Sequence, residues 1–172
     1  VNLFSAILSM QHASSSCTLD PMNKLLDAPQ PSLFAPSQEH PAKLMHVVES
    51  FYETELGATY LGDSREVLKA LPGNSVNLVF TSPPYALHFK KEYGNVSKAD
   101  YVDWFLSFAR EIHRVLADDG SFVLNIGGSW NPGSPTRSLY HYKLMIALVE
   151  DLGFHLAQEC YWYNPAKMPV PA

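Results

Sequence analysis

The chain has 172 residues, of which 47% are hydrophobic, which suits one domain with a substantial core. Its formal net charge of −5 excludes a surface that is basic all round, and with it tight nonspecific DNA binding by this chain alone. No run of 18 apolar residues occurs, and Cys17, Cys160 and the scattered histidines have no metal-type spacing, so we expect a reduced, cytoplasmic protein without a membrane span or a metal.

The first part of the chain differs in composition from the rest. Residues 1–41 are rich in serine, proline, glutamine and alanine, so we expect a disordered leader there. Residues 42–55 are predicted to form a short helix, because their apolar side chains recur at helical spacing: Leu44, Val47, Val48 and Phe51. Residues 42–172 are taken as one folded unit.

From Ala58 onwards, short apolar runs alternate with amphipathic segments. A short strand is predicted over residues 59–61 and a helix over 64–71, which Pro72-Gly73 ends. Residues 76–80 form the next strand, and its nearly unbroken apolar run is typical of a strand that is covered on both faces.

The clearest predicted helix follows Ser97-Lys98-Ala99-Asp100, which has the form of a capping box. Asp118-Asp119-Gly120 is expected to close this helix. One face carries an apolar stripe formed by Tyr101, Trp104, Phe105, Phe108, Ile112 and Val115.

The rest of the chain repeats the alternation. A strand is predicted over residues 121–126, a helix over 139–152 that ends at Gly153, and a last strand over 154–163. The side chains of the second helix that we expect to face inward are Met145, Ile146, Leu148 and Val149.

Strands separated by single helices indicate βαβ units, and therefore an α/β fold with a doubly wound, mostly parallel sheet and right-handed crossovers. Ligands bind such sheets at the carboxyl ends of the strands. Asp63, Ser82 and Gly127-Gly128 each follow a predicted strand. The pattern therefore gathers candidate polar residues along one edge.

Thr81-Ser82-Pro83-Pro84-Tyr85 comes directly after the apolar strand. Proline fixes φ and lacks an N–H, and the residue before a proline is held extended, so this corner is stiff. Its hydroxyl and its prolyl carbonyls can accept hydrogen bonds, and Tyr85 adds a flat ring. The set suits the exocyclic amino group of a planar heterocycle. A plain proline turn with a core tyrosine is the alternative for these letters alone.

This box resembles the signature of the DNA amino-methyltransferases that modify cytosine N4 or adenine N6, which is (Asp/Asn/Ser)-Pro-Pro-(Tyr/Phe/Trp) after a strand. The chain looks closest to the cytosine-N4 branch of restriction–modification systems. The resemblance runs from about Tyr60 to the end of the chain. Besides the box, it includes the blocks Tyr60–Ser64, Lys90–Asn95, Tyr101–Ala109, Asp119–Val123 and Tyr161–Pro165.

The resemblance implies an incomplete Rossmann-like fold and methyl transfer from S-adenosylmethionine to N4 of a cytosine flipped out of duplex DNA. Ser82 Oγ and the Pro83 carbonyl would accept the amino hydrogens, which frees the nitrogen lone pair, and Pro84 belongs to the same catalytic corner. Tyr85 would stack on the base. Trp162 and Tyr163 would form the opposite wall, with an edge-of-core pair in a strand as the open alternative.

The same resemblance implies that Asp63, together with Ser82, contacts S-adenosylmethionine, whereas an N-cap of the next helix is the alternative for Asp63. Gly127-Gly128 does not fit the G-x-G-x-x-G pattern and is interpreted as a loop. Arg137 is either a phosphate contact or an ordinary surface arginine.

The family's glycine-rich Phe-x-Gly-x-Gly loop, which holds the methionine end of the cofactor, does not occur in this sequence. We therefore expect residues 42–172 to be the amino-terminal, catalytic half of a methyltransferase domain that needs a carboxy-terminal half or a complementing chain. Alone it would be weakly active or inactive. The alternatives are an adenine-N6 enzyme, a nonenzymatic half-subunit, and a proline-directed interaction module.

Overall fold

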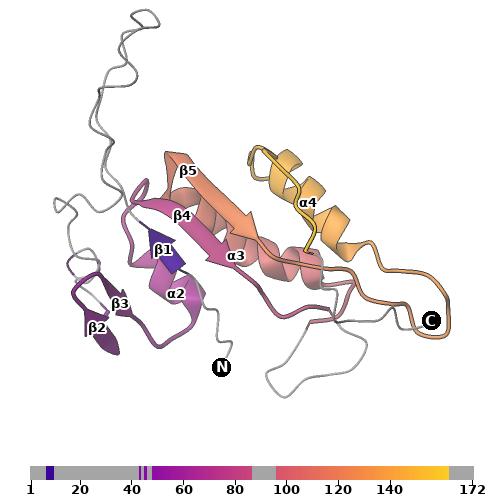
Figure 1. Cartoon of the computed structure of the whole chain (residues 1–172), viewed down its shortest axis with the longest axis horizontal. Coiled ribbons are helices and arrows are strands. Elements are labelled where there is room, and N and C mark those ends of the chain that lie inside the picture. Colours follow the sequence, from indigo (N-terminus) through magenta and orange to yellow (C-terminus); the bar gives the residue numbers. More distant parts are fainter. Residues whose placement is uncertain (1–6, 10–42, 44, 46–47, 87–95, 163–172) are drawn as a thin grey trace, which may run out of the picture.

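A computed structural model describes residues 7–9, 43, 45, 48–86 and 96–162 of the chain. The elements in chain order are β1 (Ile7–Ser9), β2 (Tyr52–Thr54), β3 (Gly57–Thr59), α2 (Ser64–Lys69), β4 (Val76–Thr81), α3 (Tyr101–Val115), β5 (Leu116–Leu124) and α4 (Tyr140–Glu150) (Figure 1). None of these helices is both long enough and apolar enough to cross a membrane.

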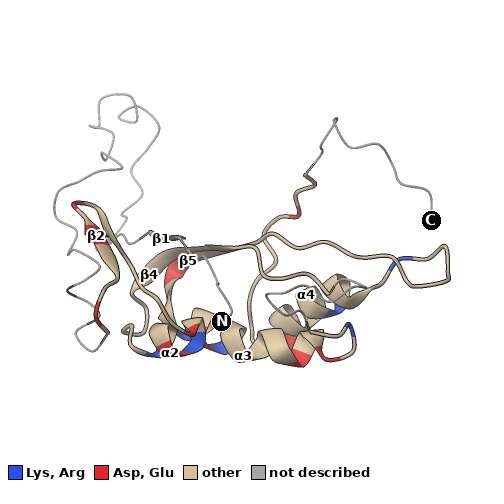
Figure 2. Cartoon of the chain, turned by 90° about the horizontal axis from the view of Figure 1, so that it is seen from below, with Lys and Arg blue, Asp and Glu red and all other residues tan. Residues whose placement is uncertain are grey.

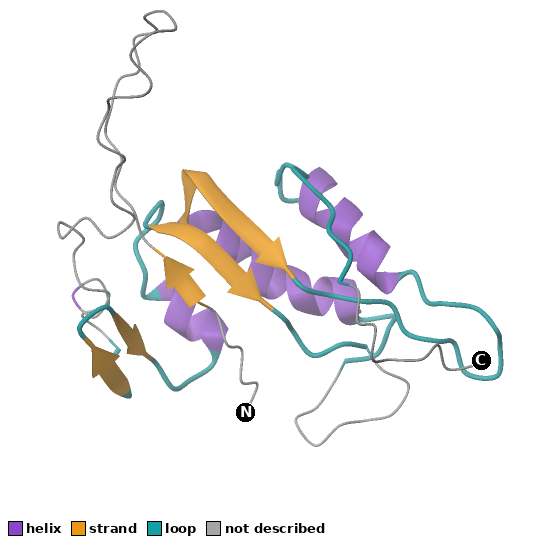
Figure 3. Cartoon of the chain, in the orientation of Figure 1, coloured by secondary structure: helices purple, strands orange, loops and turns teal. Residues whose placement is uncertain are grey.

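The main sheet has the order β1-β4-β5. Strands β4 and β5 are parallel and are joined through α3, so they form the βαβ unit that the sequence predicts, whereas β1 pairs with β4 in the antiparallel sense. Strands β2 and β3 form a separate antiparallel hairpin (Figure 3 shows both sheets). The predicted α/β class with parallel strands is confirmed.

The described helices α2, α3 and α4 all lie on one side of the sheet (Figure 2). Their apolar faces pack on Val79 and Phe122, and the buried aromatic residues of α3 stand at the centre of this core. On the other side Phe80 and Val123, which pair in the ladder, are 43% and 42% exposed. The second helical layer of a doubly wound sheet is therefore not formed by the described residues.

Helix α3 buries the predicted stripe, because Tyr101, Phe105, Phe108, Ile112 and Val115 are all buried, while Trp104 is half-buried. The predicted capping box is a turn that precedes the helix. Ser97 Oγ accepts from the Asp100 N–H at 3.2 Å and donates to the Asp100 carboxylate at 2.7 Å. Asp100 is the N-cap residue but makes no side-chain capping bond.

The expected end of this helix at Asp118-Asp119-Gly120 is wrong. Helix α3 ends at Val115 and β5 starts at Leu116, so the three residues lie inside the strand. The physical reason is a shift in the ladder. Val76 pairs with Leu116 but Leu78 pairs with Ser121, so an irregularity in β5 absorbs the extra residues.

The helix predicted over residues 42–55 is wrong in its second half, where residues 52–54 form β2. The strand expected over 59–61 is β3, which ends at Thr59 and pairs with β2 outside the main sheet. Thr54 Oγ1 donates to the Gly57 carbonyl at 3.3 Å, and the Phe51 N–H donates to Thr59 O at 2.7 Å. These bonds close a local hairpin that the apolar spacing did not reveal.

The predicted α4 is present, but its buried face is displaced from the predicted one. Leu148 is buried as expected and Met145 is half-buried, whereas Ile146 and Val149 are exposed. Tyr140, Leu144 and Ala147 are buried instead, on the face that packs on α3. When a helix is apolar on several faces, its sequence does not determine which face is buried.

No strand forms over residues 154–162, contrary to the prediction for 154–163. Gly153 ends α4 as expected, with a positive φ of 77°. The Gly153 N–H donates to Val149 O at 3.2 Å, which is the bond of an αL helix end, and the Phe154 N–H donates to Leu148 O at 3.1 Å. Phe154 then packs 5.5 Å from the ring of Phe122, and the following residues are exposed.

Some predictions fall on residues outside the described part. These are the leader over residues 1–41 apart from β1, the block Lys90–Asn95, Tyr163 and the last nine residues. Those predictions stay as they are.

Candidate functional site

The corner after β4 has one exposed residue. Thr81 and Pro83 are buried, Pro84 and Tyr85 are half-buried, and only Ser82 is exposed over residues 81–85. No hydrogen bond to the Ser82 hydroxyl forms within the described residues. The structure therefore presents this hydroxyl to solvent on a backbone that two prolines stiffen.

Three side chains from other elements hold the corner in place. The Tyr101 hydroxyl on α3 donates to the Pro84 carbonyl at 2.9 Å, and the Tyr85 hydroxyl donates to Asn125 Oδ1 at 3.4 Å. Ser129 Oγ donates to the Ala86 carbonyl at 2.9 Å. Burial raises the pKa of Tyr101, so this hydroxyl stays protonated and remains a donor at neutral pH.

The two prolyl carbonyls of the corner differ in whether they already accept a hydrogen bond. The Pro84 carbonyl already accepts a hydrogen bond from Tyr101, so it serves the local structure. The backbone of Thr81 is occupied as well, because its carbonyl accepts from the Asn125 N–H at 2.9 Å. Ser82 Oγ is therefore the exposed acceptor of the predicted set. Pro83 is buried, and its carbonyl accepts no hydrogen bond within the described residues.

Gly127-Gly128 lies in the loop that passes beside this corner, as the sequence indicated. A Cβ on Gly127 would stand 3.8 Å from the Tyr85 ring, which is ordinary contact. A Cβ on Gly128 would stand 2.7 Å from His141 Cε1 and 3.2 Å from the Ser138 carbonyl. Gly128 is therefore required for the close packing of the loop on α4.

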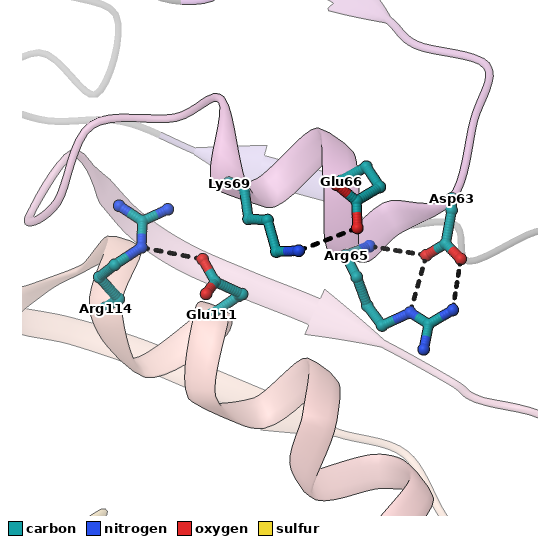
Figure 4. A network of polar contacts seen from close by, with 6 residues as sticks. All are labelled: Asp63, Arg65, Glu66, Lys69, Glu111 and Arg114. Atoms are coloured by element: carbon teal, nitrogen blue, oxygen red, sulfur yellow. Dashed lines mark hydrogen bonds and ion pairs between the residues drawn. The ribbon is translucent and has the colours of Figure 1, made fainter.

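Asp63 is the N-cap residue of α2. Its Oδ1 accepts from the Arg65 N–H at 3.0 Å and from Arg65 Nε at 3.1 Å, and its Oδ2 pairs with Arg65 Nη2 at 2.6 Å (Figure 4). The hydrogen bonds from Arg65 lower the pKa of Asp63 to about 2. The N-cap alternative is therefore observed, and contact with a cofactor stays a prediction.

A second set of contacts fixes α2 on α3. Arg114 pairs with Glu111 at 2.9 Å (Figure 4). It also donates to the carbonyls of Leu68 at 2.8 Å and Leu71 at 3.0 Å. Because these carbonyls belong to the last turn of α2 and the residues after it, Arg114 satisfies acceptors that a helix end leaves unpaired.

The structure does not bring Trp162 to the corner. Its side chain is 88% exposed, and Trp162 takes part in no ring contact of the described residues. Tyr163 lies outside them. The wall opposite Tyr85 therefore stays a prediction from resemblance.

Sequence reasoning missed the side chains that support the corner, namely Tyr101, Asn125, Ser129 and Tyr140. Tyr101 was interpreted as part of an apolar stripe, and no pattern marked its hydroxyl. The Tyr140 hydroxyl donates to the Gly127 carbonyl, and its ring lies 4.6 Å from that of Tyr101. The only signal was that both tyrosines stand in the first turn of a helix. No group of three or more histidine, cysteine or acidic residues over the described ranges is arranged to hold a metal ion.

Comparison with known proteins gives consistent matches. Residues 76–172 match a family model described as DNA methylase. Type II methyltransferase M.PvuII of Proteus hauseri is 49% identical over 120 residues, which cover 70% of this chain and 36% of the relative. Type II methyltransferase M.SfiI of Streptomyces fimbriatus is 36% identical over 133 residues, which cover 66% and 31%.

A solved structure also matches. PvuII DNA methyltransferase (cytosine-N4-specific) superposes with a TM-score of 0.63 at 47% identity, over 73% of this chain and 44% of that chain. The chain spans about a third of the length of the curated relatives that it matches.

Proposed function

We propose, on the premise that this chain belongs to the DNA methylase family, that it provides the amino-group site of a site-specific DNA methyltransferase. The proposed reaction moves a methyl group from S-adenosylmethionine to N4 of a cytosine flipped out of duplex DNA. The observation that carries the proposal is the exposed Ser82 hydroxyl on a corner that Tyr101, Asn125 and Ser129 hold rigid.

The chemistry needs acceptors more than it needs acids or bases. The lone pair of the cytosine amino nitrogen is shared with the ring, so the nitrogen is a poor nucleophile. Ser82 Oγ and the Pro83 carbonyl would each accept a hydrogen bond from one of its two N–H groups. These bonds would favour a tetrahedral nitrogen with a free lone pair. Acceptors that are positioned in advance are worth a few kcal/mol in the transition state. Tyr85 would support the flipped ring from one side.

Asp63 fits one part of the cofactor. A carboxylate has about four acceptor positions, and the contacts from Arg65 use three of them, so one position on Oδ2 is left. Its side chain is 39% exposed, so this position is accessible. Asp63 would accept a hydrogen bond from the nucleoside part. When bound, S-adenosylmethionine supplies the electrophilic methyl group.

The partner in the proposal is the remainder of a full-length methyltransferase, in the same polypeptide or in a second chain. Strand β5 stands at the sheet edge within the described residues, and Phe80 and Val123 leave an apolar face beside it. The span of about a third of the relatives agrees with this. The added part would bring the glycine-rich loop. A DNA-modifying enzyme also agrees with a cytoplasmic location.

The test compares the chain alone with the chain completed by the missing part. With S-adenosylmethionine and duplex DNA, the chain alone should give trace transfer at most, and the completed enzyme should give 4-methylcytosine in hydrolysed nucleosides. Detection of 6-methyladenine instead would select the adenine-N6 alternative. Full turnover by the chain alone would contradict the need for a second half.

Ser82→Ala is the decisive variant in the completed enzyme. It should lower kcat about 100-fold, because one acceptor of the amino group is lost, and it should leave DNA binding nearly unchanged. Ser107→Ala is a matched control, since the Ser107 hydroxyl only bonds to the Trp104 carbonyl within α3. Equal kcat values for the two variants would remove Ser82 from the mechanism.

A further inference from the structure

An open hollow of about 400 Å³ lies where α4 begins, next to the corner and not part of it. Its polar lining comes from Lys98, Asn131, Arg137, Ser138, Tyr140 and Lys143. We propose that this hollow binds a phosphodiester group of the DNA strand beside the flipped base. The proposal rests on the proposed function in one respect, which is that DNA is the substrate.

The charge of the hollow stands out against the rest of the chain. The chain has 12 basic and 17 acidic residues, yet three basic residues and no acidic one line this hollow. The ion pairs of the described residues all lie on α2 and α3, where Arg65, Lys69 and Arg114 have carboxylate partners. Figure 2 shows basic positions in the loop before α4 and in α4, with acidic positions at the nearby start of α3. A local excess of unpaired positive charge attracts phosphate.

Arg137 is held in a pose that suits phosphate. Its guanidinium lies 4.7 Å over the Trp130 ring, and residues 130 and 137 form an antiparallel bridge. The Asn131 N–H donates to Thr136 O at 2.9 Å, and the Ser138 N–H donates to Ser129 O at 2.8 Å, so the two strands of the loop are tied together. Stacking leaves the edge of the guanidinium, with its forked N–H groups, available to two phosphate oxygens.

The two lysines of the hollow provide further positive charge for a phosphate. Lys98 Nζ donates to the Trp130 carbonyl at 2.7 Å and to Asn131 Oδ1 at 3.3 Å, which leaves one of its three N–H groups free. Lys143 stands in the first turn of α4, where the helix has no side-chain cap. The unpaired N–H groups of that turn favour an anion at the same place.

The loop connects the hollow to the corner. Ser129, which lies next to Trp130, donates to the Ala86 carbonyl, and Tyr140 in the hollow donates to Gly127 beside Tyr85. The loop that lines the hollow therefore also borders the place proposed for the base on Tyr85. A phosphate held in the hollow would fix the register of the strand without reading its sequence.

The test uses the whole 172-residue chain and its three tryptophans, Trp104, Trp130 and Trp162. The indole N–H resonance of Trp130 is followed by NMR during titration with a short oligonucleotide, with inorganic phosphate and with S-adenosylmethionine. We expect the oligonucleotide and phosphate to shift the Trp130 resonance saturably. Trp104, which is half-buried on α3 and does not line the hollow, serves as the internal reference, and its resonance should not shift on addition of phosphate.

The variant pair is Arg137→Gln and Arg110→Gln. Arg110 is an exposed arginine of α3 that does not line the hollow. Arg137→Gln should abolish the phosphate-induced shift, and it should reduce the slope of log Kd against log salt for duplex DNA by about 0.9, the value of one lost phosphate contact. Arg110→Gln should change neither quantity. An unshifted Trp130 resonance, or equal slopes for the two variants, would overturn the proposal.

Two further outcomes separate this proposal from its premise. A Trp130 shift with S-adenosylmethionine but not with phosphate would assign the hollow to the cofactor carboxylate and overturn the DNA assignment. A shift with phosphate and oligonucleotide, together with no methylation by the completed enzyme, would keep the phosphate site and remove the proposed function. Normal kcat and normal KM for DNA in completed Arg137→Gln enzyme would remove the phosphate site alone.

Discussion

Asp63 and Ser82 both follow a predicted strand, but their side chains differ in hydrogen bonding. Asp63 is bound to Arg65 by three contacts and caps a helix, whereas Ser82 is exposed and makes no hydrogen bond within the described residues. The corner around Ser82 is rigid because other side chains bind its neighbours. A polar residue at the carboxyl end of a strand therefore indicates a binding site only when its side chain still has a hydrogen-bonding position that no other residue uses.

Among the substitutions that test the difference between these two positions, the largest loss of DNA binding is expected at Tyr85. Tyr85→Ala in the completed enzyme should weaken capture of the flipped base by about 1–3 kcal/mol, seen as roughly a 5- to 150-fold rise in KM for DNA. Tyr85→Phe is the matched variant, because it keeps the ring and loses only the 3.4 Å bond to Asn125. Equal losses in both variants would mean that the hydroxyl, rather than the ring, matters.

Tyr101→Phe tests whether the rigidity of the corner is needed. The change leaves the carbonyl of the half-buried Pro84 without its donor, and it should lower the free energy of unfolding by about 1–3 kcal/mol in urea titrations. It should also lower kcat while KM for S-adenosylmethionine stays constant. A loss of stability with unchanged kcat would show that the corner tolerates movement.

Asp63 is the position whose carboxylate is already bound, by Arg65. Asp63→Ala should cost about 1 kcal/mol of stability through loss of the N-cap, whereas Asp63→Asn keeps an acceptor and removes the charge. The pKa of Asp63 is about 2 in the folded chain and about 3.9 in an unfolded one, so the charge stabilises the fold above about pH 4.

This contribution should disappear as the pH falls from about 4 to 2. Stability curves of the native chain and of Asp63→Asn should therefore converge over that range, as measured by urea unfolding at each pH. Curves that stay parallel down to pH 2 would contradict the assigned ion pair with Arg65.

The smallest effect is expected at Thr81, directly below Ser82. Thr81 is buried, and its Oγ1 has no hydrogen-bond partner within the described residues. Thr81→Val removes a buried hydroxyl that costs free energy and keeps the branched shape, so stability should stay the same or rise by up to about 1 kcal/mol. A clear fall in the thermal midpoint would reveal a partner for this hydroxyl.

The sequence was sufficient for elements whose pattern is set locally. The strand at β4 and the apolar stripe of α3 were both predicted and are both present. The described residues do not cover β4 on both faces as predicted, because Phe80 is 43% exposed. The stiffness of the Pro83-Pro84 corner also follows from proline geometry alone. These features depend on neighbours in the sequence, so sequence patterns reach them.

The errors concern elements that depend on distant partners. Aromatic residues at both ends of 154–162 favoured a strand, but a strand needs a neighbour to pair with, and these residues form no ladder with β5. Helical spacing before Phe51 gave no sign of the hairpin closed by Thr54 and Gly57. The Tyr101 hydroxyl was hidden in an apolar stripe, because the carbonyl that it binds, that of Pro84, lies in another part of the sequence.

Strand β1 has a consequence for how a complete enzyme assembles. Ile7–Ser9 forms only three residue pairs with β4, and it runs antiparallel along an edge that a further parallel strand would also use. If the proposed second half adds a strand on this edge of β4, and not beside β5, that strand has to displace β1, and docking is then a strand exchange. Because so few pairs are broken, we expect exchange to be rapid, and a chain without its first ten residues should join its counterpart faster still.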